Sequence, residues 1–154
     1  MRQPTIVGSI EIAANPTTIY GLITDLSRWD QFVVETRVPA RAVPDSLAPG
    51  TTFRAWNRNG LWRWRTTTKV LQAVPPRSLA FEVTSFGRPV ATWRYDIVPT
   101  ARGSRVTEST RDMRGRTMCL VSVAATGVVD RTAHNQRNIE RTLARLKAEA
   151  EKPA

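Results

Sequence analysis

The last third of the chain, from Val128 to Glu151, is the feature that most limits what this sequence can fold into. In a helix, where each residue turns by about 100°, the apolar and uncharged residues of this stretch would lie on one side. Its basic residues and a glutamate would lie on the remaining faces. The residues on that side are Val128, Asn135, Ile139, Leu143 and Leu146. No glycine or proline interrupts the stretch up to Lys152, so the pattern predicts a helix of about six turns. Such a helix needs a partner layer to cover its apolar side.

The segments before this helix are typical of β-strands, so we expect the partner layer to be one antiparallel sheet. Thr5 to Ala13 alternates apolar and polar residues, as a half-buried first strand does. Asn15 and Pro16 then supply an N-cap and a first helical residue for a short helix. Ser27, followed by Asp30 three residues later, predicts the start of a second short helix.

The clearest turn signal is Asn59-Gly60, which separates two β-like runs and predicts a two-residue hairpin turn of type I′. That turn places Asn57 opposite Trp62 and Phe53 opposite Thr66. One face of the hairpin carries five cations, which are costly to desolvate, so we expect the other face to point inward. The outer face carries Arg54, Trp56, Arg58, Arg63, Arg65 and Lys69. The inner face carries Phe53, Ala55, Asn57, Trp62, Trp64, Thr66, Thr68 and Val70.

Four further segments complete the expected sheet. Val33 to Val43 is extended and ends near prolines, which is typical of an edge strand. Later strands are predicted around Leu79 to Val83, Trp93 to Ile97 and Val106 to Thr110, with a loop at Pro99 to Gly103. The order of strand, two short helices, six strands and long helix predicts a single α+β domain over residues 1–154.

Several short segments along nearly the whole chain carry a resemblance to a known family. They are Asn15-Pro16 with Leu26 to Trp29, Gly50 to Phe53, Asn57 to Gly60, Trp64 to Thr67, Pro75 to Phe81, Trp93 to Tyr95, Arg105 to Ser109, and Thr142 to Lys147. In these segments the chain resembles the START-like SRPBCC superfamily, in particular its polyketide cyclase/dehydrase and lipid-transport group. The resemblance implies a helix-grip fold, in which a curved seven-stranded antiparallel sheet wraps around the long C-terminal helix. It also implies a cavity between the two.

A long helix against a strongly curved sheet leaves a pocket, and we expect inward side chains to line it. The expected lining combines aromatic and aliphatic side chains with a few polar ones. Its residues are Phe53, Asn57, Trp62, Trp64, Thr66, Phe81, Trp93, Tyr95, Glu108, Thr110, Thr132, Asn135 and Ile139. The aromatic residues fit ordinary core packing as well, whereas an inward polar group needs a partner, a water or a ligand.

Glu108 is the one carboxylate that we predict on the inner face. An apolar pocket would raise its pKa and suit it to general acid/base catalysis. Two other placements stay open: near the rim beside an arginine, or facing outward after a one-residue slip in the preceding loop. His134 projects away from the apolar side of the helix, so we expect it at the surface.

The sequence offers little for a metal or a cofactor. Cys119 and His134 are its only cysteine and histidine, so we expect no metal site, and Cys119 in its apolar run reads as an inert thiol. No glycine-rich phosphate loop is present, so we expect no cofactor. We see no signal-peptide pattern, and the apolar run from Met118 to Val129 is too short to span a bilayer, which favours a cytoplasmic protein.

The net charge of +10 comes mainly from arginine, because lysine occurs only at positions 69, 147 and 152. This bias fits a GC-rich genome, and it also fits acidic partners or an anionic membrane surface. Trp56 among the outer arginines resembles a platform for single-stranded nucleic acid, although a solvated strand face explains it too. Arg111 to Val129 joins three arginines to an apolar run, as in an interfacial membrane anchor or a lid over one end of the cavity.

The leading interpretation is a protein that binds or carries a small hydrophobic molecule, whether aromatic, polyketide-like or lipid. The alternative is a polyketide cyclase or dehydratase in which Glu108 acts as acid and base. Binding of nucleic acid or an acidic partner through the outer arginines is a third, less favoured interpretation. The sequence leaves open whether the protein is a monomer or a homodimer.

Overall fold

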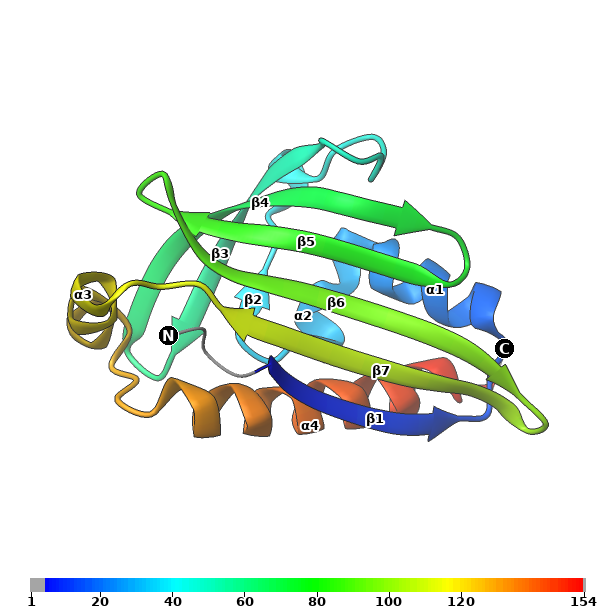
Figure 1. Ribbon diagram of the computed structural model, residues 1–154. Coiled ribbons are helices and arrows are strands. Elements are labelled where there is room, and N and C mark those ends of the chain that lie inside the picture. The colour runs from blue at the N-terminus through cyan, green and yellow to red at the C-terminus, as the bar shows by residue number, and fades with distance from the viewer. Residues whose placement is uncertain (1–4, 154) are drawn as a thin grey trace.

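The computed structural model describes residues 5–153, and its elements follow the predicted order (Figure 1). The first part comprises β1 (Thr5–Ile12), α1 (Pro16–Thr24), η1 (Leu26–Arg28), α2 (Trp29–Phe32), β2 (Thr36–Arg37) and η2 (Ala40–Ala42). The central strands are β3 (Thr52–Asn59), β4 (Trp62–Val74), β5 (Ser78–Ser85), β6 (Arg88–Thr100) and β7 (Gly103–Asp112). Two helices follow, α3 (Arg116–Thr126) and α4 (Arg131–Ala150).

The seven strands form one antiparallel sheet in the order β1-β7-β6-β5-β4-β3-β2. The register shifts between Val70 and Gln72 on β4, and again between Val83 and Thr84 on β5. Irregularities of this kind bend a strand and increase its twist, so the sheet curves. α4 runs along β1 and β7 and also contacts α1 and α2 (Figure 1). The predicted helix-grip fold is confirmed.

The helix after β1 begins as predicted, whereas the next one does not. Asn15 accepts a hydrogen bond from the backbone N–H of Thr18 at 2.8 Å, and Pro16 is the first residue of α1. The predicted cap at Ser27 is wrong, because Asp25 caps a 3-10 turn there instead and accepts from the N–H of Ser27 at 3.2 Å. α2 follows that turn directly and has no side-chain cap.

The β3–β4 hairpin has a register two residues away from the predicted one. Asn59 pairs with Trp62, so the turn residues are Gly60 and Leu61. Gly60 has a φ of 60°, as a type II′ turn requires at its first central position. Side chains alternate with period two, so a shift of two residues leaves the predicted inner and outer faces unchanged. The predicted loop at Pro99 to Gly103 is also shorter, because Thr100 pairs with Gly103.

The C-terminal helix starts later than predicted. Gly127, with a φ of 68°, ends α3 in the left-handed conformation, and Asp130 accepts a hydrogen bond from the N–H of Ala133 at 3.0 Å. These two caps separate α3 from α4, so Val128 lies before the long helix. With 20 residues, α4 is about 30 Å long.

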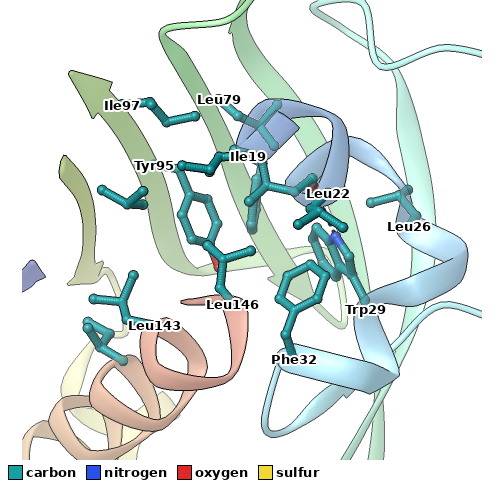
Figure 2. Packing of buried hydrophobic residues seen from close by; sticks show 14 of the residues in the cluster. Ile19, Leu22, Leu26, Trp29, Phe32, Leu79, Tyr95, Ile97, Leu143 and Leu146 are labelled. Atoms are coloured by element: carbon teal, nitrogen blue, oxygen red, sulfur yellow. Dashed lines mark hydrogen bonds between the residues drawn. The ribbon is translucent and has the colours of Figure 1, made fainter. Parts of the chain in front are cut away.

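The hydrophobic core closes one end of the space between sheet and helix. Residues of α1, η1 and α2 pack there against β5, β6 and the second half of α4 (Figure 2). They include Ile19, Leu22, Leu26, Trp29, Phe32, Leu79, Ile97, Leu143 and Leu146. The Trp29 ring is fixed because its Nε1 donates to the carbonyl of Ile23 at 3.0 Å. The first half of α4 instead presents the buried amides of Asn135 and Asn138, which leaves the other end of the space unfilled.

Candidate functional site: a cavity between sheet and helix

A cavity of about 150 Å³ lies between the sheet, α3 and the first half of α4. Apolar cavities of about this volume are large enough to take up benzene. Phe86 lines this cavity from the β5–β6 turn, and the main aromatic wall comes from five side chains on α2, β4, β5 and β6. They are Trp29, Trp64, Phe81, Trp93 and Tyr95.

Most of the predicted lining does meet at this cavity. The predicted residues found there are Asn57, Trp64, Thr66, Phe81, Trp93, Tyr95, Glu108 and Asn135. They come from five strands and one helix, so the alternation of inward and outward residues was predicted correctly along most of the sheet. Several unpredicted residues also line the cavity, and those with polar or charged side chains include Glu35, Asp112, Arg114, Arg131, Asn138 and Thr142.

Five predicted residues lie elsewhere. Phe53 packs edge-on against Trp29, with ring centroids 5.9 Å apart, and belongs to the core. Ile139 is fully buried against Gly8, where a Cβ would lie 2.5 Å from Ile139 Cγ2. Thr110 is buried and donates to the carbonyl of Thr92 at 3.0 Å.

Thr132 and Trp62 are the other two. Thr132 is exposed on the first turn of α4, and Trp62 is 46% exposed at the start of β4. Neither residue lines the cavity: Thr132 faces solvent, whereas Trp62 lies on the predicted inner face of β4 but beyond the end of the cavity. Alternation and helical periodicity identify a face, but they do not say how far along that face the cavity extends.

Glu108 lies deep in the cavity and faces inward as predicted, with 3% of its surface exposed. The hydroxyl of Tyr95, the residue opposite it on β6, donates to Glu108 Oε1 at 2.9 Å. The rim position beside an arginine is therefore wrong, and so is the outward orientation. Burial raises the pKa of Glu108 to about 8, against a smaller opposing effect of the Tyr95 hydrogen bond. Burial and the neighbouring Glu108 likewise raise the pKa of Tyr95 well above its ordinary value.

A second polar wall joins β2, β3 and β4. Thr36 donates to Asn57 Oδ1 at 2.9 Å, and Asn57 Nδ2 donates to Thr66 Oγ1 at 2.9 Å. Asn57 and Thr66 are both buried. This chain of hydrogen bonds fixes the Asn57 amide, so the wall presents a defined polar strip beside the Trp64 ring.

Asp112 and Arg114 form an ion pair at the end of β7, beside α3. The Arg114 guanidinium binds both oxygens of Asp112 and also donates to Ser122 on α3. Burial acts to raise the pKa of Asp112, but the hydrogen bonds and the charge of Arg114 outweigh it, so that pKa is lowered. Asp112 could have been found from the sequence, because it lies four residues after Glu108 on the same face of the strand.

At another part of the cavity, Glu35 contacts three side chains of α4. Its Oε1 lies 3.1 Å from His134 Nε2 and 3.7 Å from Arg131 Nη1, and its Oε2 accepts from Asn138 Nδ2 at 3.4 Å. The prediction of a surface His134 was wrong, because its side chain is only 16% exposed. The segment between α2 and β2 covers that flank of the helix, which a helical wheel cannot show.

The apolar run after Arg116 forms α3, whose Met118, Val121 and Ala125 line one end of the cavity. The β3–β4 hairpin holds the end of this helix, since Asn59 Nδ2 donates to the carbonyl of Thr126 at 3.0 Å. Trp62 packs so closely on Gly127 that a Cβ there would lie 2.3 Å from its Nε1. The structure therefore gives α3 the position of a lid.

Three other predictions concern metals, membranes and the outer face. Among residues 5–153, no group of three or more histidine, cysteine, aspartate or glutamate side chains could hold a metal ion. In the same part of the chain, no helix has both the length and the hydropathy of a membrane span. On the outer face, the Arg65 guanidinium lies 4.9 Å from the centroid of the Trp56 ring, as expected for a tryptophan shielded by an arginine. Nucleic-acid binding there stays a prediction.

A curved antiparallel sheet that grips a C-terminal helix over an apolar cavity defines a START-like protein of the SRPBCC superfamily. Residues 3–151 match the family described as polyketide cyclase / dehydrase and lipid transport, and the chain belongs to that family. No curated protein matches the sequence significantly.

Solved structures of low sequence identity share the fold. Protein CV1439 from Chromobacterium violaceum superposes with a TM-score of 0.75 at 10% identity, over 97% of this chain and 99% of that one. The Polyketide_cyc-like protein Cgl2372 from Corynebacterium glutamicum gives 0.65 at 22% identity, over 96% and 91% of the two chains. The di-domain ARO/CYC BexL of the BE-7585A biosynthetic pathway gives 0.71 at 16% identity, and the match covers 99% of this chain and 51% of BexL.

Proposed function

We propose that the protein binds and carries a small hydrophobic ligand in the cavity between sheet and helix. The observation that supports this most is the pairing of an aromatic wall with a few buried polar groups, the composition typical of small-molecule sites. The aromatic wall would remove the ligand's apolar surface from water, while Asn57, Glu108 and Asn135 would orient its polar groups.

Titration with a neutral solvatochromic dye such as Nile red tests this proposal. We expect saturable binding that weakens about tenfold in Trp64→Ala, because that variant removes part of the aromatic wall. Trp56→Ala is the matched control, since Trp56 lies on the opposite face of the neighbouring strand and is 39% exposed. Absence of saturable binding, or an equal effect of both variants, would contradict the proposal.

A second candidate function, a cyclase or dehydratase reaction, is favoured by Glu108. A buried carboxyl that keeps its proton near neutral pH is suited to protonate a leaving hydroxyl or a carbonyl oxygen, and its conjugate base can take a proton from carbon. Glu108→Gln should then abolish turnover of a poly-β-ketone thioester while affinity for it changes little. Turnover that survives in this variant would exclude Glu108 as the acid and base.

We also propose that the protein is cytoplasmic. We propose further that the end of the molecule that holds the cavity contacts the anionic surface of a bilayer facing the cytoplasm. The β3–β4 turn, the β5–β6 turn, α3 and the connection from α3 to α4 lie at the same end of the molecule (Figure 1), and each carries an exposed apolar side chain. These side chains are Leu61, Phe86, Leu120 and Val129. Exposed Arg111 and Arg116 lie in the same segment as Leu120, and cations beside apolar groups are typical of membrane-surface contacts.

Sedimentation with lipid vesicles tests the membrane contact. We expect binding to phosphatidylglycerol vesicles and little to phosphatidylcholine vesicles, with loss of binding in Leu120→Glu. Leu71→Glu is the control, because Leu71 is 47% exposed in the second half of β4, away from the β3–β4 turn. Equal binding to both lipids, or equal loss in both variants, would contradict a specific contact through α3.

A further inference from the structure

The two carboxyl oxygens of Glu108 have different environments. Oε1 accepts the hydrogen bond from Tyr95, whereas Oε2 is buried and has no hydrogen-bond partner among the described residues. Glu108 also lines the cavity. A buried polar atom without a partner is rare in folded proteins and is expected to meet a ligand or a water.

The protonation of Glu108 decides what Oε2 can do. Oε1 already accepts from Tyr95, so the proton of a neutral carboxyl belongs on Oε2, which then acts as a donor. Burial raises the pKa of Glu108 to about 8 and outweighs the opposing Tyr95 hydrogen bond, so Glu108 is mainly neutral at pH 7. A carboxylic acid kept neutral in an apolar site can donate a hydrogen bond to a ligand oxygen.

The groups that surround Glu108 do not offer it a countercharge. Gly8 lies opposite it on β1 and Tyr95 lies opposite it on β6. From α4, the cavity receives the uncharged Asn135, Asn138 and Thr142. The remaining charged residues of the cavity lining are Glu35, Asp112, Arg114 and Arg131. They are paired with one another, Asp112 with Arg114 and Glu35 with Arg131.

We propose that the cavity selects ligands with a carbonyl oxygen, or an equivalent neutral acceptor, placed against Oε2 of Glu108, which donates the hydrogen bond. This inference rests on the proposed ligand-binding function. It narrows the ligand class to aromatic or other compact apolar ketones. The reason is that the carbonyl oxygen of the ligand would reach Glu108 at the buried end of a cavity with aromatic walls. A ligand that is purely hydrocarbon would leave Oε2 without a partner, and an anionic ligand head would be desolvated without a cation beside it.

Competitive binding of 1-indanone and indane tests the proposal, because the two differ only by a carbonyl in place of a methylene. The readout is the ratio of their dissociation constants, followed by tryptophan fluorescence from the cavity wall. We expect Glu108→Leu to reduce the preference for 1-indanone about two- to tenfold, the worth of one neutral hydrogen bond. Glu108→Gln should keep most of the preference, because its amide still donates.

The pH dependence gives an independent readout. The preference of the native protein for 1-indanone should decline as the pH rises through about 8, while that of Glu108→Gln stays constant. The Gln variant retains Glu35, Asp112, Arg114, Arg131 and Tyr95, so it separates Glu108 from the other groups of the cavity. If both compounds bind and their ratio is the same in the native protein and Glu108→Leu, the inference is wrong and the binding function stands. If neither binds the native protein, the proposed function fails, and the inference fails with it.

Discussion

Two carboxylates on the same face of β7 show what burial does with and without a basic partner. Glu108 and Asp112 are four residues apart on one strand and both line the cavity. Burial acts to raise the pKa of each. The pKa of Glu108 is raised to about 8, whereas the pKa of Asp112 is lowered, because only Asp112 has an arginine bound to both oxygens.

This difference divides the cavity into two chemical environments. The part around Glu108 and Tyr95 is uncharged near neutral pH and offers hydrogen bonds, which suits a neutral ligand group. The part around Asp112 and Arg114 is ionised, and its charges are already paired with each other. Because Arg114 also donates to Ser122, the ionised part links the end of β7 to α3, which lies over the cavity.

The largest expected effect is on the pH dependence of stability, with opposite signs for the two acids. Glu108 has a folded pKa of about 8 against an ordinary 4.5, so its stabilising contribution is complete below about pH 4.5 and is lost as the pH rises toward 8. One such group changes the free energy of unfolding by about 1.4 kcal/mol per pH unit within that window. Asp112 behaves in the opposite way, since its lowered pKa stabilises the fold above the ordinary value of 3.8 and that gain is lost on acidification.

Urea denaturation of Glu108→Gln between pH 5 and 8 measures this effect. We expect the variant to gain stability relative to the native protein with each pH unit, because the amide has no proton to lose. Glu82→Gln, on β5 two strands away from β7 and half-exposed, is the control and should leave the slope unchanged. A native slope equal to that of Glu108→Gln would mean that Glu108 is ionised in the folded protein.

Removing the partner of Asp112 should make the second acid resemble the first. In Arg114→Met the half-buried carboxylate loses its countercharge, so we expect a loss of about 2 to 3 kcal/mol in the free energy of unfolding at pH 7. The pKa of Asp112 should then rise, because burial is opposed only by the backbone hydrogen bond from residue 114 and the charge of Arg131. Denaturation at several pH values checks both points.

Two further variants distinguish the loss of this ion pair from a general destabilisation of the fold. Asp112→Asn combined with Arg114→Met should recover part of the loss, since no unpaired charge remains. Arg116→Met should have little effect, because Arg116 is exposed at the start of α3. A loss in Arg114→Met no larger than in Arg116→Met would mean that the pair does not stabilise the fold.

The comparison also shows why the sequence predicted one acid and missed the other. Glu108 was predicted inward from the alternation of Val106, Glu108 and Thr110, although the predicted loop before them was too long. That error was harmless, because the strand's own pattern fixed its face. Asp112 lies beyond the predicted end of the strand, and its charge state depends on Arg114 in the segment that follows.

Partners distant in sequence were the main feature that patterns could not supply. His134 was assigned to the surface from its angle on the helix, yet Glu35, 99 residues away, lies beside it. Thr132 and Asn135 are three residues apart on α4, and only Asn135 lines the cavity. Periodicity therefore predicted the architecture and most of the inner wall, while the extent of the cavity and the pairing of its charges depend on how the segments meet.

The smallest of these expected effects comes from Tyr95. Its hydroxyl donates to Glu108 Oε1 and thereby lowers a pKa that burial has raised. Tyr95→Phe should therefore raise the pKa of Glu108 further and reduce the free energy of unfolding by about 1 kcal/mol at pH 6, the cost of one lost hydrogen bond. The measurement is the free energy of unfolding as a function of pH. The pH at which its decline on the alkaline side ends should be higher than in the native protein. Tyr20→Phe, on α1 and away from Glu108, should leave that pH unchanged, and an upward shift in both variants would show that the hydroxyl of Tyr95 does not set the proton affinity of Glu108.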